Sequence, residues 1–165
     1  MEEIDSLASL DTFEEIDPAN IPKEATVFES KFTLKLKVDA LNNPIKRKAR
    51  LVVLSQTEKV SKETPLYSPT ANDQTVELFW ALCAYLRLKI RGFDVYLAFC
   101  HPLIRRLIVI RLPKQLTKDD ARIFWKLKKT LYGLKDSPRI FNEELTNHLV
   151  ACGYIQAQAD KCLFY

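Results

Sequence analysis

Two stretches of the chain alternate hydrophobic and polar residues with the period of two that a half-buried β-strand shows. In residues 31–38 the apolar positions share one face, as Phe32, Leu34, Leu36 and Val38. Residues 45–53 repeat the alternation, and one face there carries Lys46, Lys48 and Arg50. Between them, Asn42-Asn43-Pro44 favours a turn. The pattern predicts a hairpin with one basic face.

Two stretches near the start and middle of the chain show helical spacing of apolar residues. Residues 2–10 carry a single apolar stripe, which predicts a short helix. Residues 75–88 are apolar nearly all round and follow Asp73, a good N-cap residue. Such a helix has no polar face to turn to water. We therefore expect a buried helix over about 73–90.

A third helix is bounded by recognisable start and stop residues. Ser137 suits the N-cap, Pro138 the first helical position, and Gly153 the residue just after the end. We expect this helix over about 137–152. Earlier, Thr117 and Asp120 have the spacing of a capping box that opens a short helix.

Three short apolar runs predict further strands, at residues 90–95, 107–112 and 162–165. The first ends close to a single charge, Asp94. Two main helices, a basic hairpin and several short strands together indicate an α+β fold. A chain of 165 residues is long enough to bury one core.

Charge is distributed unevenly along the chain. Residues 1–24 contain eight acidic residues and one lysine, a net charge of −7. Since the whole chain carries +4, the remainder carries +11. An acidic leader before a basic body is typical of a polyanion-binding protein, and a Lys-rich soluble domain is the simpler alternative.

The four cysteines, Cys83, Cys100, Cys152 and Cys162, form no CxxC pair and no zinc-ligand spacing. Buried free thiols in a reducing intracellular compartment, cytoplasm or nucleus, are expected, with Cys83 and Cys152 in helical patterns. The acidic N-terminus excludes a signal peptide. The longest apolar stretch, residues 76–88, is too short and too charged to span a membrane.

Two features of the sequence suggest chemistry. Lys46, Arg47, Lys48 and Arg50 concentrate positive charge within five positions, which suits phosphate contact, although lysines also protect edge strands. Asp94 lies at the end of an apolar run, where a carboxylate needs a positive partner. A divalent metal is one such partner, and an ion pair or cap is the other.

Several segments resemble one known family, in unbroken order along the whole chain. They include residues 31–37 (KFTLKLK), 48–52 (KARLV), 94–99 (DVYLAF), 128–139 (KKTLYGLKDSPR) and 160–164 (DKCLF). Together they resemble the reverse transcriptase (RNA-dependent DNA polymerase) domain of copia-type LTR retrotransposons. The resemblance implies polymerase fingers and palm, with a leader and fingers-like hairpin in residues 1–72 and a partial palm in 73–165.

The resemblance also implies a mechanism and its residues. DNA synthesis on an RNA or DNA template uses two Mg²⁺ ions, held by carboxylates and substrate phosphates. By resemblance, Asp94 is the catalytic carboxylate and a metal ligand, with the Val95 carbonyl as a second ligand. The implied nucleotide-binding residues are Lys48, Arg50, Phe99, Tyr132 and Gly133, and the implied nucleic-acid contacts are Lys46 and Arg47. A dNTP and a template–primer are the implied partners.

One element of the family pattern has no match in the chain. The Asp-Asp hairpin of motif C is missing, and Asp119-Asp120 has the charged flanks of a helix cap rather than an apolar strand. We therefore expect a truncated copy that is inactive alone, whose exposed sheet edge promotes self-association. A domesticated nucleic-acid-binding module without catalysis and a structural or interaction relic are the alternative interpretations.

Overall fold

The computed structural model describes residues 2–56, 58, 66–116 and 123–165. Its elements follow in the order α1 (Glu2–Ser9), β1 (Phe13–Ile16), β2 (Thr26–Val38), β3 (Pro44–Val53), α2 (Asp73–Tyr85), β4 (Ile108–Arg111), β5 (Phe124–Leu127) and α3 (Ser137–Ala151). Short 3-10 turns lie at Pro18–Asn20, Ala98–Cys100 and Lys114–Leu116. The predicted α+β class is confirmed. Within the described residues, no helix is long and apolar enough to cross a membrane.

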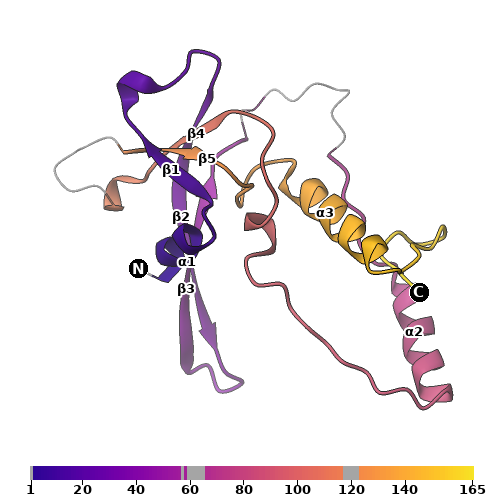
Figure 1. Ribbon diagram of the computed structural model, residues 1–165. Coiled ribbons are helices and arrows are strands. Elements are labelled where there is room, and N and C mark those ends of the chain that lie inside the picture. The colour runs from indigo at the N-terminus through magenta and orange to yellow at the C-terminus, as the bar shows by residue number, and fades with distance from the viewer. Residues whose placement is uncertain (1, 57, 59–65, 117–122) are drawn as a thin grey trace.

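The five strands form one mixed sheet in the order β1-β5-β4-β2-β3 (Figure 1). Neighbours are antiparallel except β2 and β4, which run parallel. The core lies against this sheet, where Leu51, Ile108 and Ile110 are fully buried. Leu7 of α1 is also fully buried and belongs to the same cluster. The sheet thus joins the leader, the hairpin and the later strands in one body.

The predicted hairpin is confirmed as β2 and β3, which extend well beyond the rest of the sheet (Figure 1). Asn42 takes a positive φ of 63° in the turn. Asp39 organises that turn, because its Oδ1 accepts hydrogen bonds from the backbone N–H groups of Leu41 and Asn43, both at 2.8 Å. These bonds, led by the one from Asn43, lower the pKa of the Asp39 carboxyl.

Strands β1 and β5 were not expected from the sequence. Each has only four residues, and β1 contains two glutamates, so neither shows a useful alternation. Tertiary contacts create them. Phe13 and Trp125 stack with their ring centroids 3.5 Å apart and their planes 6° apart. The strand expected at 107–112 is present as β4, whereas residues 162–165 form only an isolated bridge, Gln156 with Phe164.

The expected burial of the second helix is wrong. Only Cys83 of α2 is buried, while Leu78, Phe79 and Trp80 are 45 to 58% exposed. Figure 1 shows α2 beside the end of α3, away from the sheet. An apolar pattern indicates that a helix is suited to packing against another element, but it does not show which element covers it. Among the described residues, no second layer covers the rest of α2.

The core strand expected at residues 90–95 is also absent. This segment has no regular structure, and Phe93 is 87% exposed. A strand exists only when a neighbour satisfies its backbone hydrogen bonds. No described strand pairs with these residues, so the apolar run remains an irregular connection towards Ala98–Cys100.

The helix ends are close to the expected positions. α2 begins after Asn72, whose side chain accepts from Gln74 N at 3.2 Å, so Asn72 and not Asp73 is the N-cap. For α3 the N-cap is Asp136, one residue before Ser137. Ser137 instead donates its hydroxyl to the carbonyl of Leu131 at 2.8 Å.

The end of α3 is confirmed at Gly153, where φ is +95°. The N–H of Gly153 donates to Val150 O at 2.9 Å, and that of Tyr154 donates to Leu149 O at 3.1 Å. This pair of bonds is the Schellman motif. The capping box at Thr117 and Asp120, and the Asp119-Asp120 pair, lie outside the described residues.

The cysteines are free thiols, as expected. Cys83 and Cys100 are buried, but Cys152 is exposed, so its expected burial is wrong. Cys152 is the C-cap of α3, and the residues before it, Val150 and Ala151, are exposed as well.

Candidate functional site

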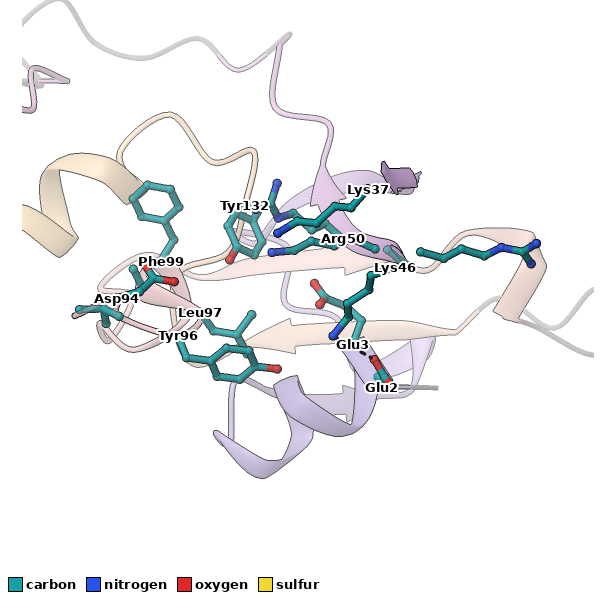
Figure 2. A pocket seen from close by; sticks show the side chains of 15 residues that line it. Glu2, Glu3, Lys37, Lys46, Arg50, Asp94, Tyr96, Leu97, Phe99 and Tyr132 are labelled. Atoms are coloured by element: carbon teal, nitrogen blue, oxygen red, sulfur yellow. Dashed lines mark ion pairs between the residues drawn. The ribbon is translucent and has the colours of Figure 1, made fainter. Parts of the chain in front are cut away.

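A cavity of about 490 Å³ lies between β3, α1 and the loop that precedes Ala98–Cys100 (Figure 2). It brings together eight of the nine residues singled out from the sequence, which are Lys46, Arg47, Lys48, Arg50, Asp94, Val95, Phe99 and Tyr132. These residues come from three separate segments of the chain. Their convergence was not visible in the spacing of the sequence.

One wall of the cavity is basic because of the register of the hairpin. Lys37 on β2 lies directly opposite Lys46 on β3, and Lys35 lies opposite Lys48. Like charges in such cross-strand positions repel one another. Their accumulation therefore lowers the stability of the hairpin unless an anion binds there.

A second wall is aromatic. The Arg50 guanidinium lies 5.3 Å from the centroid of the Tyr132 ring, within cation–π distance. Phe99 meets Tyr132 edge to face at 5.7 Å and Phe141 of α3 at 5.9 Å. Burial raises the pKa of the Tyr132 hydroxyl, so it stays neutral at physiological pH. The wall offers a flat apolar ring surface beside the basic strand.

Gly133 does not line the cavity, although it follows Tyr132. It adopts φ +94°, and a Cβ there would come within 2.2 Å of the Val53 carbonyl oxygen. The turn is fastened by the bond from Val53 N to Tyr132 O, 2.8 Å, and by that from Ser55 Oγ to Gly133 O, 2.5 Å. Gly133 therefore lets the turn approach β3 closely and so places the Tyr132 ring.

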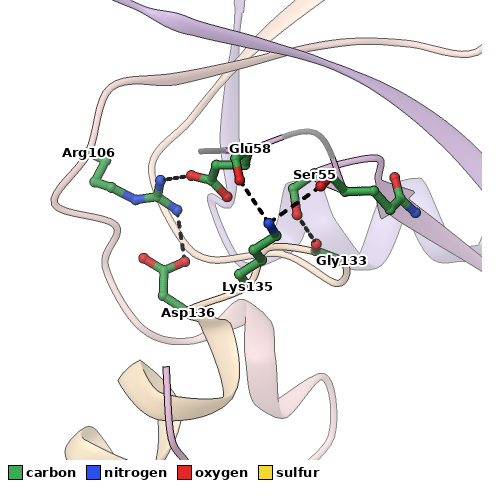
Figure 3. Close-up of polar contacts among 7 residues, drawn as sticks. Ser55, Glu58, Arg106, Gly133, Lys135 and Asp136 are labelled. Carbon is green, nitrogen blue, oxygen red and sulfur yellow. Dashed lines mark hydrogen bonds and ion pairs between the residues drawn. The ribbon is translucent and has the colours of Figure 1, made fainter. Parts of the chain in front are cut away.

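A polar network that includes Arg106, Glu58 and Lys135 also holds this turn (Figure 3). Arg106 forms ion pairs with Glu58 and with Asp136, the latter at 2.8 Å. Lys135 donates to the carbonyl of Glu58 at 2.8 Å. Because Asp136 is buried, Arg106 supplies the positive charge that its carboxylate needs.

Asp94 and Val95 belong to the irregular segment rather than to a strand. Asp94 is exposed and faces the same cavity as Phe99 (Figure 2). Within the part of the chain that the structure describes, no group of three His, Cys, Asp or Glu residues could hold a metal ion. The donor set of the described residues therefore does not by itself make a magnesium site, and the charged lining of the cavity consists of five basic side chains and three carboxylates.

Four polar lining residues were missed by sequence reasoning: Glu2, Glu3, Lys37 and Tyr96. Lys37 could have been found, because any hairpin register that pairs the two basic faces places it near Lys46. Glu2 and Glu3 lie in the helix expected over residues 2–10, but nothing in the sequence connected them with the cavity. Their position follows from α1 docking on the sheet.

Comparison with known families decides the class of the protein. Residues 13–165 match the family model described as reverse transcriptase (RNA-dependent DNA polymerase). The chain belongs to this family. The resemblance to copia-type reverse transcriptases noted in the sequence is confirmed.

The curated relatives of this reverse transcriptase chain are transposon polyproteins. It is 27% identical over 166 residues to the retrovirus-related Pol polyprotein from transposon TNT 1-94 of Nicotiana tabacum, covering 99% of this chain and 12% of that protein. It is 26% identical to the Pol polyprotein from transposon RE1 of Arabidopsis thaliana, covering 87% and 10%. The chain thus spans about a tenth of the length of these relatives. No solved structure matches it.

Proposed function

We propose that the cavity binds the triphosphate of an incoming deoxynucleoside triphosphate, as part of RNA-directed DNA polymerase activity. The observation that carries the proposal is the convergence of Lys37, Lys46, Lys48 and Arg50 beside the rings of Tyr132 and Phe99. Charge-assisted contacts from lysine and arginine are the usual way to hold phosphates. An aromatic ring beside them suits a sugar or base.

In this proposal each wall has its own role. Lys48 and Arg50 bind phosphate oxygens, and Tyr132 and Phe99 pack against the sugar. Phe99 leaves little room beside C2′ and therefore favours a deoxyribose. Asp94 and the Val95 carbonyl would be the chain's ligands for a Mg²⁺ ion that arrives with the triphosphate, and such an ion would supply activation of the primer oxygen.

The proposal is tested by titrating the chain with a dNTP in magnesium buffer and following tryptophan fluorescence or heat. Arg50→Ala and Lys48→Ala should each weaken binding by roughly tenfold, the cost of one charge-assisted contact. Lys31→Ala is the control, because Lys31 is exposed on β2 and does not line the cavity. Equal affinities of all four proteins would contradict the proposal.

A second candidate function is binding of nucleic acid without catalysis. The hairpin favours it, since its opposed lysines continue as a basic face along β2 and β3 outside the aromatic wall. This function predicts RNA or DNA affinity that falls steeply with salt. It also predicts that Lys31→Glu weakens polynucleotide binding, whereas the dNTP proposal predicts no change in nucleotide affinity for that variant.

A further inference from the structure

α1 places two carboxylates in a cavity whose opposite wall is basic (Figure 2). Glu2 Oε2 lies 4.0 Å from Lys46 Nζ. Glu3 Oε1 accepts a hydrogen bond from the backbone N–H of Leu51 at 3.3 Å. Leu51 follows Arg50 directly on β3, so the Glu3 carboxylate occupies the edge of the strand that carries the proposed phosphate ligands.

The position of Glu3 is fixed by the anchoring of its helix. Leu7, one turn further along α1, is fully buried in the core. Ser6 Oγ lies 2.9 Å from the hydroxyl of Tyr96 in the loop that follows Asp94. The N–H of Thr12 then donates to Leu7 O at 3.1 Å, which closes the end of the helix. Because α1 is held at these points, Glu3 cannot move far from β3 without disturbing the core.

Electrostatics give the Glu3 carboxylate a divided environment. Burial raises its pKa, while the hydrogen bond from Leu51 and the nearby charges of Arg50 and Lys48 act in the opposite direction. The carboxylate is therefore an anion held next to the same cations that a phosphate would contact. Two anions that share one pair of cations weaken each other's binding.

We propose that Glu3 is a built-in competitor of the polyphosphate site, whose negative charge, held at the Leu51 amide, offsets the positive charges of Arg50 and Lys48 that a phosphate group would contact. This inference rests on the proposed function of the cavity. Phosphate binding is then stronger when Glu3 is protonated or when salt screens its charge. Free polyphosphates bind less tightly than the five basic lining residues alone would allow.

The experiment is a calorimetric titration of the whole chain with inorganic tripolyphosphate, without metal, at neutral pH. Glu3→Gln removes the charge and keeps an oxygen that can accept from the Leu51 N–H, so the helix stays docked. Asp5→Asn makes the same charge change on α1 at a residue that does not line the cavity. Glu3→Gln should bind at least about threefold more tightly than the natural sequence, and Asp5→Asn should not differ from it.

A pH series adds a readout that a structural role would not move. The charged and titratable groups around Glu3 are Glu2, Lys37, Lys46, Arg47, Lys48, Arg50, Asp94, Tyr96, Cys100 and Tyr132. Burial raises the pKa of Cys100 to about 12 and also raises that of Tyr132, so neither titrates near neutrality. Burial raises the pKa of Glu3, so affinity for sulfate, whose own charge is constant, should rise in the natural chain as the pH falls from neutrality and Glu3 is protonated. Glu3→Gln retains the other carboxylates and should show a flatter profile.

The possible outcomes separate the competitor role of Glu3 from the proposed function of the cavity. Tripolyphosphate binding that is equal or weaker in Glu3→Gln overturns the competitor role and leaves the cavity assignment intact. Equal tightening in Glu3→Gln and Asp5→Asn also overturns it, because net charge alone then explains the effect. Absence of binding by every protein overturns the proposed function itself, together with this inference.

Discussion

The guanidinium of Arg50 lies 5.3 Å from the ring centroid of Tyr132. Val53, the last residue of the same strand, donates its backbone N–H to the Tyr132 carbonyl. The two residues are far apart in the sequence, one on the hairpin and one on the turn before α3. Their contact joins the basic and the aromatic walls of the cavity. A change that moves the turn should therefore impair both walls together.

Gly133→Ala should destabilise the chain strongly, by about 3 kcal/mol or more, because its Cβ would collide with the backbone of Val53 at an already unfavourable φ. Gly153→Ala is a matched control, since Gly153 has a similar φ but nothing within 4 Å of the added Cβ. It should lose only about 1 kcal/mol. Urea unfolding measures the loss of stability in both variants. Equal losses would show that the close approach of Gly133 to β3 does not contribute to the difference in stability.

Arg106→Ala should cost about 2 kcal/mol, because it leaves the buried Asp136 carboxylate without its partner. The partial exposure of Arg106 keeps the loss below that of a fully buried pair. Lys126→Ala breaks an ion pair with Glu14 that is exposed on both sides, and it should cost much less, because solvent screens the pair. If the two variants unfold at the same urea concentration, the network in Figure 3 does not stabilise the turn.

Alkylation should distinguish the cysteines. Cys100 is fully buried, and burial raises the pKa of its thiol from 9.0 to about 12, so it stays protonated and unreactive at mildly alkaline pH. Cys152 is exposed and should react first with iodoacetamide. Peptide mass spectrometry over time gives the order of modification. Early labelling of Cys100 in the folded chain would contradict this packing.

Because the thiolate of Cys100 forms more easily in the unfolded chain, the free energy of unfolding should fall as the pH rises from 9.0 towards about 12.

Self-association, expected from the sequence at an exposed sheet edge, remains a prediction, and the exposed apolar side chains of α2 are a second surface on which we expect it. Leu78, Phe79, Trp80 and Leu82 expose 45 to 58% of their surface on one helix. Exposed apolar surface of this kind favours association. The apparent mass in size-exclusion chromatography should rise with concentration, and Phe79→Ser with Trp80→Ser should abolish the rise. Leu41→Ser is the control, because Leu41 is 81% exposed at the far tip of the hairpin. A monomer at all concentrations would contradict the prediction.

The sequence predicted the elements whose pattern is local. The hairpin, α1, β4 and the glycine end of α3 all carry periodicity or turn residues that specify them without help from the rest of the chain. It failed where structure depends on a distant partner. β1 and β5 exist because Phe13 meets Trp125, and neither strand has a pattern of its own.

Burial was the hardest property to predict. The apolar runs in α2 and residues 90–95 predict side chains that pack against other elements. Within the described residues no element buries them. For the cavity, family motifs identified Lys48, Asp94 and Tyr132, since they lie within those segments. Glu3 could not be found in this way, because its role follows from the docking of α1 and not from a motif.

The most direct test of the cavity assignment is photo-crosslinking with an azido-dATP, followed by peptide mapping. The nucleotide should label the segment that contains Phe99 or the one that contains Tyr132, and unmodified dATP should compete with it. Arg50→Ala should reduce the labelling without changing the peptides. Labelling confined instead to the groove lined by Asn142, Asn147 and Gln156 would contradict the assignment.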